Sequence, residues 1–296
     1  MSIEIKTWEW LIETPRGLGG RYPQLLAVPP KYLFLKQGPS LRWSRIDVEE
    51  EEIESMADLP EARDSTGVLL DYDSYHKLIW YIPAGGSKAL YSYSMTNDSW
   101  RAYPEAPDTI GDGAVILWGG ESNPDHLYVI RGSHGADLWR FIISTQKWEA
   151  LRAIPAIPTS ECTGFRKNDK IYICPNPSIG AILQYDPSTG LWSTKTYTSL
   201  YEPGFLVVDD ILVVFSRDMI EIYNTNMTKK KIIQFGKPPT KLPRPRHPTI
   251  LTPPFPTTPT RQFTLLEDYI YAITGYGAEG SIFRLEKDLI LLEKPT

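Results

Sequence analysis

Cysteine is scarce in this chain, which has only Cys162 and Cys174 among its 296 residues. So few cysteines exclude a small fold held together by many disulfides and a metal site built from several thiolates. No stretch approaches the ~18 uninterrupted apolar residues that a membrane-spanning helix needs, and the first residues lack the pattern of a signal peptide. We therefore expect no membrane insertion, and a protein that is cytoplasmic or built into a particle assembled in the cytoplasm.

Positive charge is also in short supply. The chain has 31 basic and 36 acidic residues, which leave a formal net charge of −5. Proteins that bind nucleic acids usually carry a basic excess, so we expect no nucleic-acid partner.

Proline, glycine and aromatic residues, in contrast, are plentiful and recur at fixed spacings. Trp100 and Trp148 are each followed seven residues later by a proline. An aromatic residue also stands seven positions before three tryptophans: Tyr93 before Trp100, Phe141 before Trp148, and Tyr185 before Trp192. Turn-forming residues lie between the members of each pair, which indicates an antiparallel hairpin.

The hairpin belongs to a longer repeat. Six β-rich runs precede the hairpins, at residues 31–35, 77–82, 126–130, 170–174, 210–215 and 269–273. Shorter apolar runs come before these, for example at residues 67–70, 114–118 and 204–208, and we interpret them as innermost strands. Four strands per repeat and a period of 39 to 57 residues between successive anchors are typical of propeller blades.

These residues resemble the kelch repeat. Gly85, Gly86, Tyr93, Trp100 and Pro107 match its pattern in full, and the segment with Gly132, Phe141, Trp148 and Pro155 matches it nearly as well. The resemblance implies an all-β, six-bladed kelch-like β-propeller with four-stranded antiparallel blades, forming one domain over residues 1–296. In such a fold we expect the repeated tryptophans to pack between blades rather than to contact a ligand.

The sequence offers two ways to close the ring of blades. There is one more candidate for an outermost strand than there are sets of inner strands, so one candidate has no blade of its own. Residues 8–15 form an outer-strand candidate with no blade before it. The N-terminal segment 1–15 can complete the last blade beside residues 281–285, and we prefer this arrangement. In the alternative, residues 289–292 close the last blade locally.

The chemistry known in kelch-like enzymes finds no matching residues. A copper site like that of galactose oxidase needs two tyrosines, two histidines and a cysteine, whereas the four histidines here fall at scattered repeat positions. The sialidase Asp-box, the iron motif of specifier-type kelch proteins, phosphate loops and nucleophile elbows are absent from the sequence. We expect no enzyme activity, and hence no catalytic residues, no metal and no cofactor.

The two cysteines lie symmetrically about Asn168, in a hairpin whose predicted turn is residues 166–169. A simple register would place their sulfurs opposite each other on adjacent strands. Directly opposed strand residues give a disulfide strained geometry, so we favour two buried thiols over a bond.

Recognition in a propeller usually falls on the face that carries the links between blades and the loops between second and third strands. The polar and aromatic residues of these loops are our candidate binding residues: Arg131, His134, Asp137, Arg217, Asp218, Tyr276 and Glu279. Tyr276 could stack on a sugar or on a partner side chain. The alternative is that the loops are merely solvated turns.

Two segments carry charge of one sign. Residues 238–260 contain nine prolines and interrupt the repeat, and we interpret Lys241, Arg244, Arg246 and His247 within them as an arm that binds a partner. Residues 47–54 hold six acids at a predicted turn between third and fourth strands. Opposite charge at opposite ends suits head-to-tail contact with further copies of the chain or with other partners, unless both runs are only solvated loops.

Two classes of function follow. The first is a non-catalytic protein-binding or structural scaffold, as a subunit of a larger assembly such as a virion or a surface structure. The second is a carbohydrate-binding or sugar-modifying propeller, with its site at the axial mouth around Arg131, His134, Asp137 and Glu279.

Overall fold

The β-rich runs of the sequence form strands, and the strands associate in antiparallel sheets. The computed structural model describes residues 9–13, 24–36, 40–63, 65–176, 180–196, 204–208, 211–215, 219–224, 229–234, 263–275 and 280–286. Within these residues the only helical element is a single 3-10 turn, η1 (Gly132–His134). No helix in this part of the chain has the length and apolar character needed to cross a membrane.

Three sheets come from the first half of the chain. Sheet 1 contains β2 (Gln24–Val28), β3 (Tyr32–Lys36), β4 (Trp43–Asp47) and β5 (Glu52–Ser55). Sheet 2 contains β7 (Leu70–Asp73), β8 (Leu78–Tyr81), β9 (Leu90–Ser94) and β10 (Ser99–Tyr103). Sheet 3 contains β6 (Gly67–Val68), β11 (Ala114–Trp118), β12 (His126–Ile130), β13 (Leu138–Ile142) and β14 (Lys147–Ala150).

Three further sheets follow. Sheet 4 contains β15 (Thr163–Lys167), β16 (Lys170–Cys174), β17 (Ala181–Asp186) and β18 (Leu191–Thr196). Sheet 5 contains β19 (Gly204–Val208), β20 (Ile211–Phe215), β21 (Met219–Tyr223) and β22 (Lys229–Gln234). Sheet 6 contains β23 (Phe263–Leu266), β24 (Tyr269–Gly275), β25 (Gly280–Glu286) and β1 (Glu9–Glu13).

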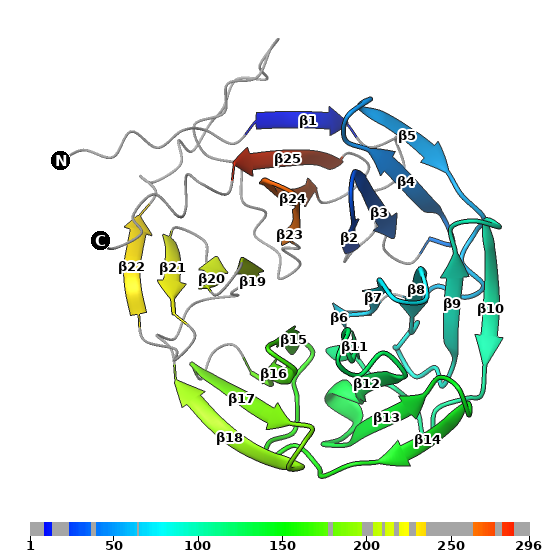
Figure 1. The fold of residues 1–296 in the computed structure, drawn as a ribbon, viewed down its shortest axis with the longest axis vertical. Coiled ribbons are helices and arrows are strands. Elements are labelled where there is room, and N and C mark those ends of the chain that lie inside the picture. Colours follow the sequence, from blue (N-terminus) through cyan, green and yellow to red (C-terminus); the bar gives the residue numbers. More distant parts are fainter. Residues whose placement is uncertain are drawn as a thin grey trace.

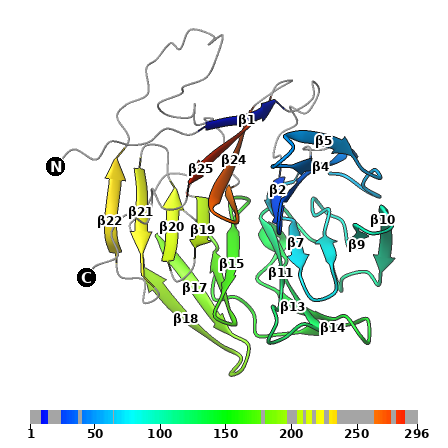
Figure 2. The same cartoon turned by 45° about the horizontal axis from the view of Figure 1, so that its top comes forward.

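The six sheets stand around a common centre (Figure 1). Their innermost strands contact one another in the order β2, β7, β11, β15, β19, β23 and back to β2. In the tilted view of Figure 2, the labelled innermost strands β2, β7, β11, β15 and β19 lie toward the middle of the molecule. The N-terminal strand β1 is the outermost strand of sheet 6, where it pairs antiparallel with β25 through Glu9 with Arg284 and Glu13 with Ser281. Residues 289–292, the alternative closing strand, lie outside the described residues.

One predicted innermost strand, at residues 67–70, is divided in the structure. Residues Gly67 and Val68 form β6, which pairs in parallel with Ala114 and Val115 of β11 and therefore joins sheet 3. Only from Leu70 onward, as β7, does the chain form the innermost strand of sheet 2. The division depends on Gly67, whose φ is +116° and on which a Cβ would lie 2.0 Å from the carbonyl oxygen of Ala114.

The repeated tryptophans pack between sheets, as predicted. Each lies directly opposite its aromatic partner in the hairpin, and the ring centroids are 5.0 Å apart in all three pairs: Trp100 with Tyr93, Trp148 with Phe141, and Trp192 with Tyr185. Each indole Nε1 also donates to a backbone carbonyl just past the outermost strand of the preceding sheet. These bonds are Trp100 to Ala57 at 2.9 Å, Trp148 to Pro104 at 2.9 Å, and Trp192 to Arg152 at 3.0 Å.

The cysteine hairpin has a different register from the one expected. Thr163, not Cys162, faces Cys174, because the turn consists of Asn168 and Asp169 alone and Lys167 pairs with Lys170. Both turn residues have positive φ, 47° and 58°, as a two-residue hairpin turn requires. The preference for two buried thiols is confirmed, since both cysteines are buried and no disulfide joins them.

The acidic run lies where it was expected, in the turn between β4 and β5. Two basic residues of the same sheet offset part of its charge. Lys31 Nζ lies 2.6 Å from Asp47 and 3.6 Å from Glu49, and Arg45 pairs with Glu54. The run is thus less strongly acidic than its sequence indicates.

Candidate functional site

Two ends of the ring can be distinguished by their loops. The loops between second and third strands and the links between sheets bond to one another, as Gly111 N–H does to the carbonyl of Arg131 at 2.8 Å and Gly86 N–H to that of Ile110 at 2.7 Å. We call this the link end. The hairpin turns between first and second strands and between third and fourth strands form the opposite end, the turn end. The candidate binding residues predicted from the sequence belong to the link end.

Arg131 is the centre of the predicted loop at the link end. Its Nη2 lies 2.6 Å from Asp108 Oδ2 and its Nη1 lies 2.9 Å from Asp137 Oδ2, while Nε donates to the carbonyl of Thr109 at 2.9 Å. Asp108 and Thr109 belong to the link between β10 and β11. Arg131 therefore fastens its own loop to that link, and its side chain is 18% exposed.

His134 lies on the same rigid loop. It ends η1, is exposed, and places Nδ1 3.3 Å from the hydroxyl of Thr109. Its ring rests on Gly111, where a Cβ would lie only 2.7 Å from the ring atoms. The structure thus brings Arg131, His134 and Asp137 together and adds Asp108, a residue that the sequence reasoning missed.

The other predicted residues cannot be placed in this group. Four candidate binding residues and the partner arm lie outside the described residues: Arg217, Asp218, Tyr276, Glu279, Lys241, Arg244, Arg246 and His247. They stay predictions.

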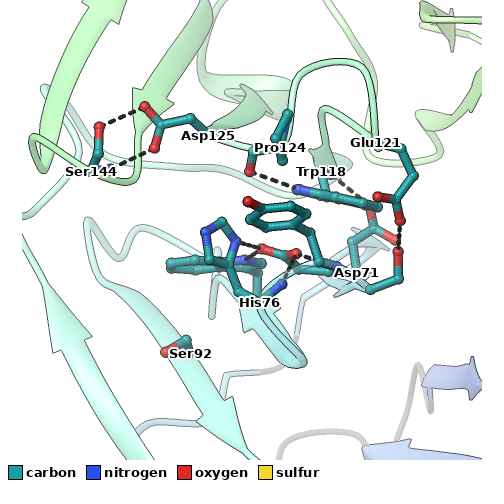
Figure 3. Close-up of polar contacts among 12 residues, drawn as sticks. Asp71, His76, Ser92, Trp118, Glu121, Pro124, Asp125 and Ser144 are labelled. Carbon is teal, nitrogen blue, oxygen red and sulfur yellow. Dashed lines mark hydrogen bonds and ion pairs between the residues drawn. The ribbon is translucent and has the colours of Figure 1, made fainter.

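A second polar group lies at the turn end of sheet 2 (Figure 3). Asp73 is fully buried and accepts hydrogen bonds from Trp80 Nε1 at 3.1 Å and from the backbone N–H groups of Tyr75 and His76. Its Oδ2 also lies 2.7 Å from His76 Nδ1. This contact fixes the imidazole and leaves its Nε2 as the outer nitrogen of a ring that is 31% exposed.

Sheet 3 adds two carboxylates to the same end. Glu121 accepts a hydrogen bond from Ser74 Oγ, which joins the turns of sheets 2 and 3. Asp125 accepts from the backbone N–H of Ser144 at 2.7 Å and from its hydroxyl at 2.6 Å. Partial burial acts to raise the pKa of Asp125, but the two bonds from Ser144 hold it below its usual value.

Asp71 joins sheets 2 and 3 nearer the axis. Its carboxylate accepts from the backbone N–H of Trp118, the last residue of β11, at 2.6 Å and from that of Tyr72 at 3.0 Å. Burial raises the pKa of Asp71 to about 6, although these two bonds and the positive charge of Arg166 act in the other direction. Asp71 therefore titrates in the physiological range.

Arg166, on β15, lies on the other side of the same strand end. A Cβ on Gly120 would lie 2.3 Å from Nη1 of Arg166, so the guanidinium packs directly on the glycine. It also lies 5.8 Å from the ring centroid of Trp118. Residues from three sheets thus converge around the end of β11.

No group of three or more histidine, cysteine, aspartate or glutamate side chains in the described part of the chain could hold a metal ion. Solved structures resemble this arrangement over nearly the whole chain. "Streptogramin B lyase structure" matches with a TM-score of 0.58 and 15% identity, covering 97% of this chain and 91% of that one. "Structure of YjhT" matches with a TM-score of 0.57 and 12% identity, covering 91% and 94%.

Both of these neighbours are β-propeller proteins. The chain has a β-propeller fold. Identities this low show the fold alone. No family model and no curated protein matches the sequence.

In a propeller each sheet is a blade, so the polar groups above are contacts between blades. The link end carries a rigid surface around Arg131, and the turn end carries carboxylates from blades 2 and 3 with a guanidinium from blade 4. The spacing of Asp73 and His76 is a local signal that could have suggested their pairing. No local signal relates Asp71 to Arg166, because 94 residues separate them.

Proposed function

We propose that this protein is a non-catalytic, protein-binding scaffold built as a six-bladed, kelch-like propeller whose last blade is completed by the N-terminal strand. The circular order of contacts among the innermost strands and the pairing of β1 with β25 support six blades and this closure. The recurring tryptophan-to-carbonyl bond supports a kelch-like repeat.

The pairing of Arg131 with both Asp108 and Asp137 is the observation that carries the proposal. Two contacts of Arg131, with Asp108 and Thr109, hold the loop to the neighbouring link, a third holds Asp137 of the same loop, and the two aspartate side chains stay 52% and 44% exposed at the surface. The loop is therefore ordered before any partner arrives, which lowers the entropy lost on binding. Such a rigid surface suits a protein partner, and the exposed side chain of Ile157, in the next link, adds apolar area to this end.

The same group is poorly suited to cleaving a glycosidic bond. Asp108 and Asp137 both contact one guanidinium, so their carboxyl groups lie close together, as the two carboxyl groups of a glycosidase do. A glycosidase, however, needs one carboxyl that stays protonated. The backbone N–H of Thr109 and the charge of Arg131 hold the pKa of Asp108 below its usual value. Asp108 is therefore a poor proton donor, which supports binding without catalysis.

We also propose that the partners of this scaffold are foreign proteins or further copies of this chain in a larger assembly. The basic residues of segment 238–260 would make a second contact with them. A carbohydrate ligand remains the second candidate.

Native mass spectrometry of the complex isolated from its source tests the proposal. Ile157 is 68% exposed at the link end, and Leu191 is 53% exposed at the turn end of blade 4, so the two give a matched pair of variants. We expect Ile157→Asp to lose the partner or the higher oligomer and Leu191→Asp to keep it. A monomer without partners in the wild-type complex, or equal loss in both variants, would contradict the proposal.

A further inference from the structure

We propose that the turn end of the propeller binds the oxyanion of a small polar ligand, with the Arg166 guanidinium as its anchor. The inference goes beyond the scaffold function, because the residues concerned lie at the opposite end from the proposed protein-binding surface. It rests on the contacts of Arg166, Asp71 and the loop that follows β11.

Arg166 differs from three other partly buried arginines in the described residues. Arg45, Arg131 and Arg140 each pair with at least one carboxylate. Arg166 is partly buried as well, yet its guanidinium takes part in no hydrogen bond or ion pair with any residue that the structure describes. A guanidinium has five N–H donors, and no nitrogen of Arg166 is among the described side-chain atoms that are both fully buried and unpaired, so its donors stay accessible from solvent. An oxyanion from a ligand would supply acceptors that the described residues do not.

The surroundings hold Arg166 in place without a hydrogen bond or ion pair from the described residues. Gly120 has φ +81° and no side chain, which lets the guanidinium lie against the backbone. The Trp118 ring lies 5.8 Å away, where a cation is attracted to its face. This packing restricts the side chain, so a bound oxyanion would meet donors whose geometry is already set.

Asp71 should make the binding of an anion at Arg166 depend on pH. The charged groups acting on it are Asp73 on its own strand, which raises its pKa, and Arg166 on β15, which lowers it. Burial outweighs both and brings the pKa to about 6. Below that pH the carboxyl is neutral and leaves the charge of Arg166 uncompensated. Above it, the carboxylate repels an incoming anion.

The rim indicates the remainder of the ligand. Glu121, which is exposed, and Asp125, which is partly exposed, lie at this end in the same loop as Gly120, on which Arg166 packs. Several carboxylates at the same end as this guanidinium disfavour a polyanion such as a nucleic acid. They suit a small molecule with one carboxylate or phosphate and with hydroxyl groups that donate hydrogen bonds.

Calorimetric titration of the full-length protein with gluconate, glucose 6-phosphate and uncharged glucose tests the proposal. The first two probes distinguish a carboxylate from a phosphate, and we expect at least one of them to bind at pH 5 while glucose does not. Arg166→Met should weaken that binding by at least about tenfold, as expected for a lost charge-assisted pair. Arg166→Lys should weaken it less, because the charge is kept and the fork is lost.

Two controls complete the experiment. Arg101→Met removes an exposed arginine on β10 and should leave binding unchanged. Asp71→Asn should bind the probe at pH 8 nearly as well as at pH 5, whereas wild-type binding should weaken over that range. A cooperative melting transition of each variant without ligand would show that the variants fold. Equal binding of glucose, undiminished binding by Arg166→Met, or no binding of either charged probe at millimolar concentration would overturn the proposal.

Discussion

Single polar side chains complete the unpaired edges of the innermost strands. Gln24 of blade 1 accepts from the N–H of Leu69 at 3.0 Å and donates to the carbonyl of Gly67 at 3.1 Å, both in the segment that leads into blade 2. Thr264 of blade 6 accepts from the N–H of Ala27 in blade 1 at 3.1 Å. Asp71 does the same between blades 2 and 3. Buried backbone groups must be paired, so these side chains act as substitutes for a further strand.

Asp71 is the member of this set whose charge should make stability depend on pH. Its pKa is about 6 in the folded protein and 3.8 as its unperturbed value. The folded state thus holds the proton more tightly, and the resulting stability is present below pH 4 and lost as the pH rises through 6. Asp71→Asn removes this loss. Its unfolding free energy relative to wild type should therefore rise by up to about 3 kcal/mol between pH 4 and pH 8, from about 1.4 kcal/mol per unit of pKa difference.

Denaturant unfolding at the two pH values measures this change. The Asn side chain keeps one acceptor for Trp118 N–H, and any constant cost of the substitution cancels in the comparison between pH values. Asp125→Asn is a control for which the change in unfolding free energy with pH should have the opposite sign. The folded pKa of Asp125 is lowered, so the stability it contributes is present above its unfolded pKa and lost on acidification. A difference between Asp71→Asn and wild type that does not change with pH would contradict the assignment.

At the scale of residues, the sequence predicted loops better than contacts. Arg131, His134 and Asp137 were found because glycines and polar residues mark a loop. Asp108 was missed, since its proximity depends on how the preceding link passes over that loop. Arg166 was noted only as part of a hairpin turn. Its contact with Gly120 forms when blades 3 and 4 pack, and such pairings carry no local pattern.

At the scale of elements, Gly67 controls where the chain changes blade. Gly67→Ala would place a Cβ 2.0 Å from the Ala114 carbonyl oxygen, at a φ of +116° that alanine rarely adopts. Gly86 is a matched control, since its φ is +91° but a Cβ there meets nothing within 4 Å. Gly86→Ala should cost only backbone strain, of order 1–3 kcal/mol. Gly67→Ala should cost at least about 2 kcal/mol more, because β6 must separate from β11. Equal melting temperatures of the two variants would contradict this role.

The tryptophan-to-carbonyl bond is the repeated joint between neighbouring blades. Trp148→Phe keeps a ring against Phe141 but removes the N–H that reaches the Pro104 carbonyl. The loss should be about 1 kcal/mol of unfolding free energy, as for one hydrogen bond. Trp100→Phe and Trp192→Phe remove the same bond from other joints, so chemical denaturation should give similar losses. Widely different losses would show that the three positions are not equivalent.

The elements themselves were largely predictable, because hairpin spacing and β-rich runs are local properties of the sequence. Tyr93 and Trp100 face each other as their separation indicated. The exception is the hairpin of Cys162 and Cys174, where the register is shifted by one residue. Symmetry in sequence does not determine a turn. The positive φ of Asn168 and Asp169 sets a two-residue turn, and every pair in the hairpin shifts with it.

At the scale of the whole molecule, we expect stability to depend on how sheet 6 meets sheet 1. Leu11 of β1 is 2% exposed and belongs to an apolar cluster that spans both blades. Its other fully buried members are Leu25, Leu33, Leu35, Ile46, Leu266 and Tyr271. The N-terminal strand thus contributes a core side chain as well as the backbone pairing with β25.

Removing this strand is the test of closure. Deletion of residues 1–15 should lower the melting temperature and promote aggregation, because β25 would become an exposed sheet edge. Leu11→Ala tests the packing alone and should cost about 2–5 kcal/mol, the range for truncating a buried leucine. If the C-terminal residues closed the blade instead, the deletion would leave melting temperature and solubility unchanged. If β1 closes it, the deletion should cost more than Leu11→Ala, because it removes the backbone pairing in addition to the side chain.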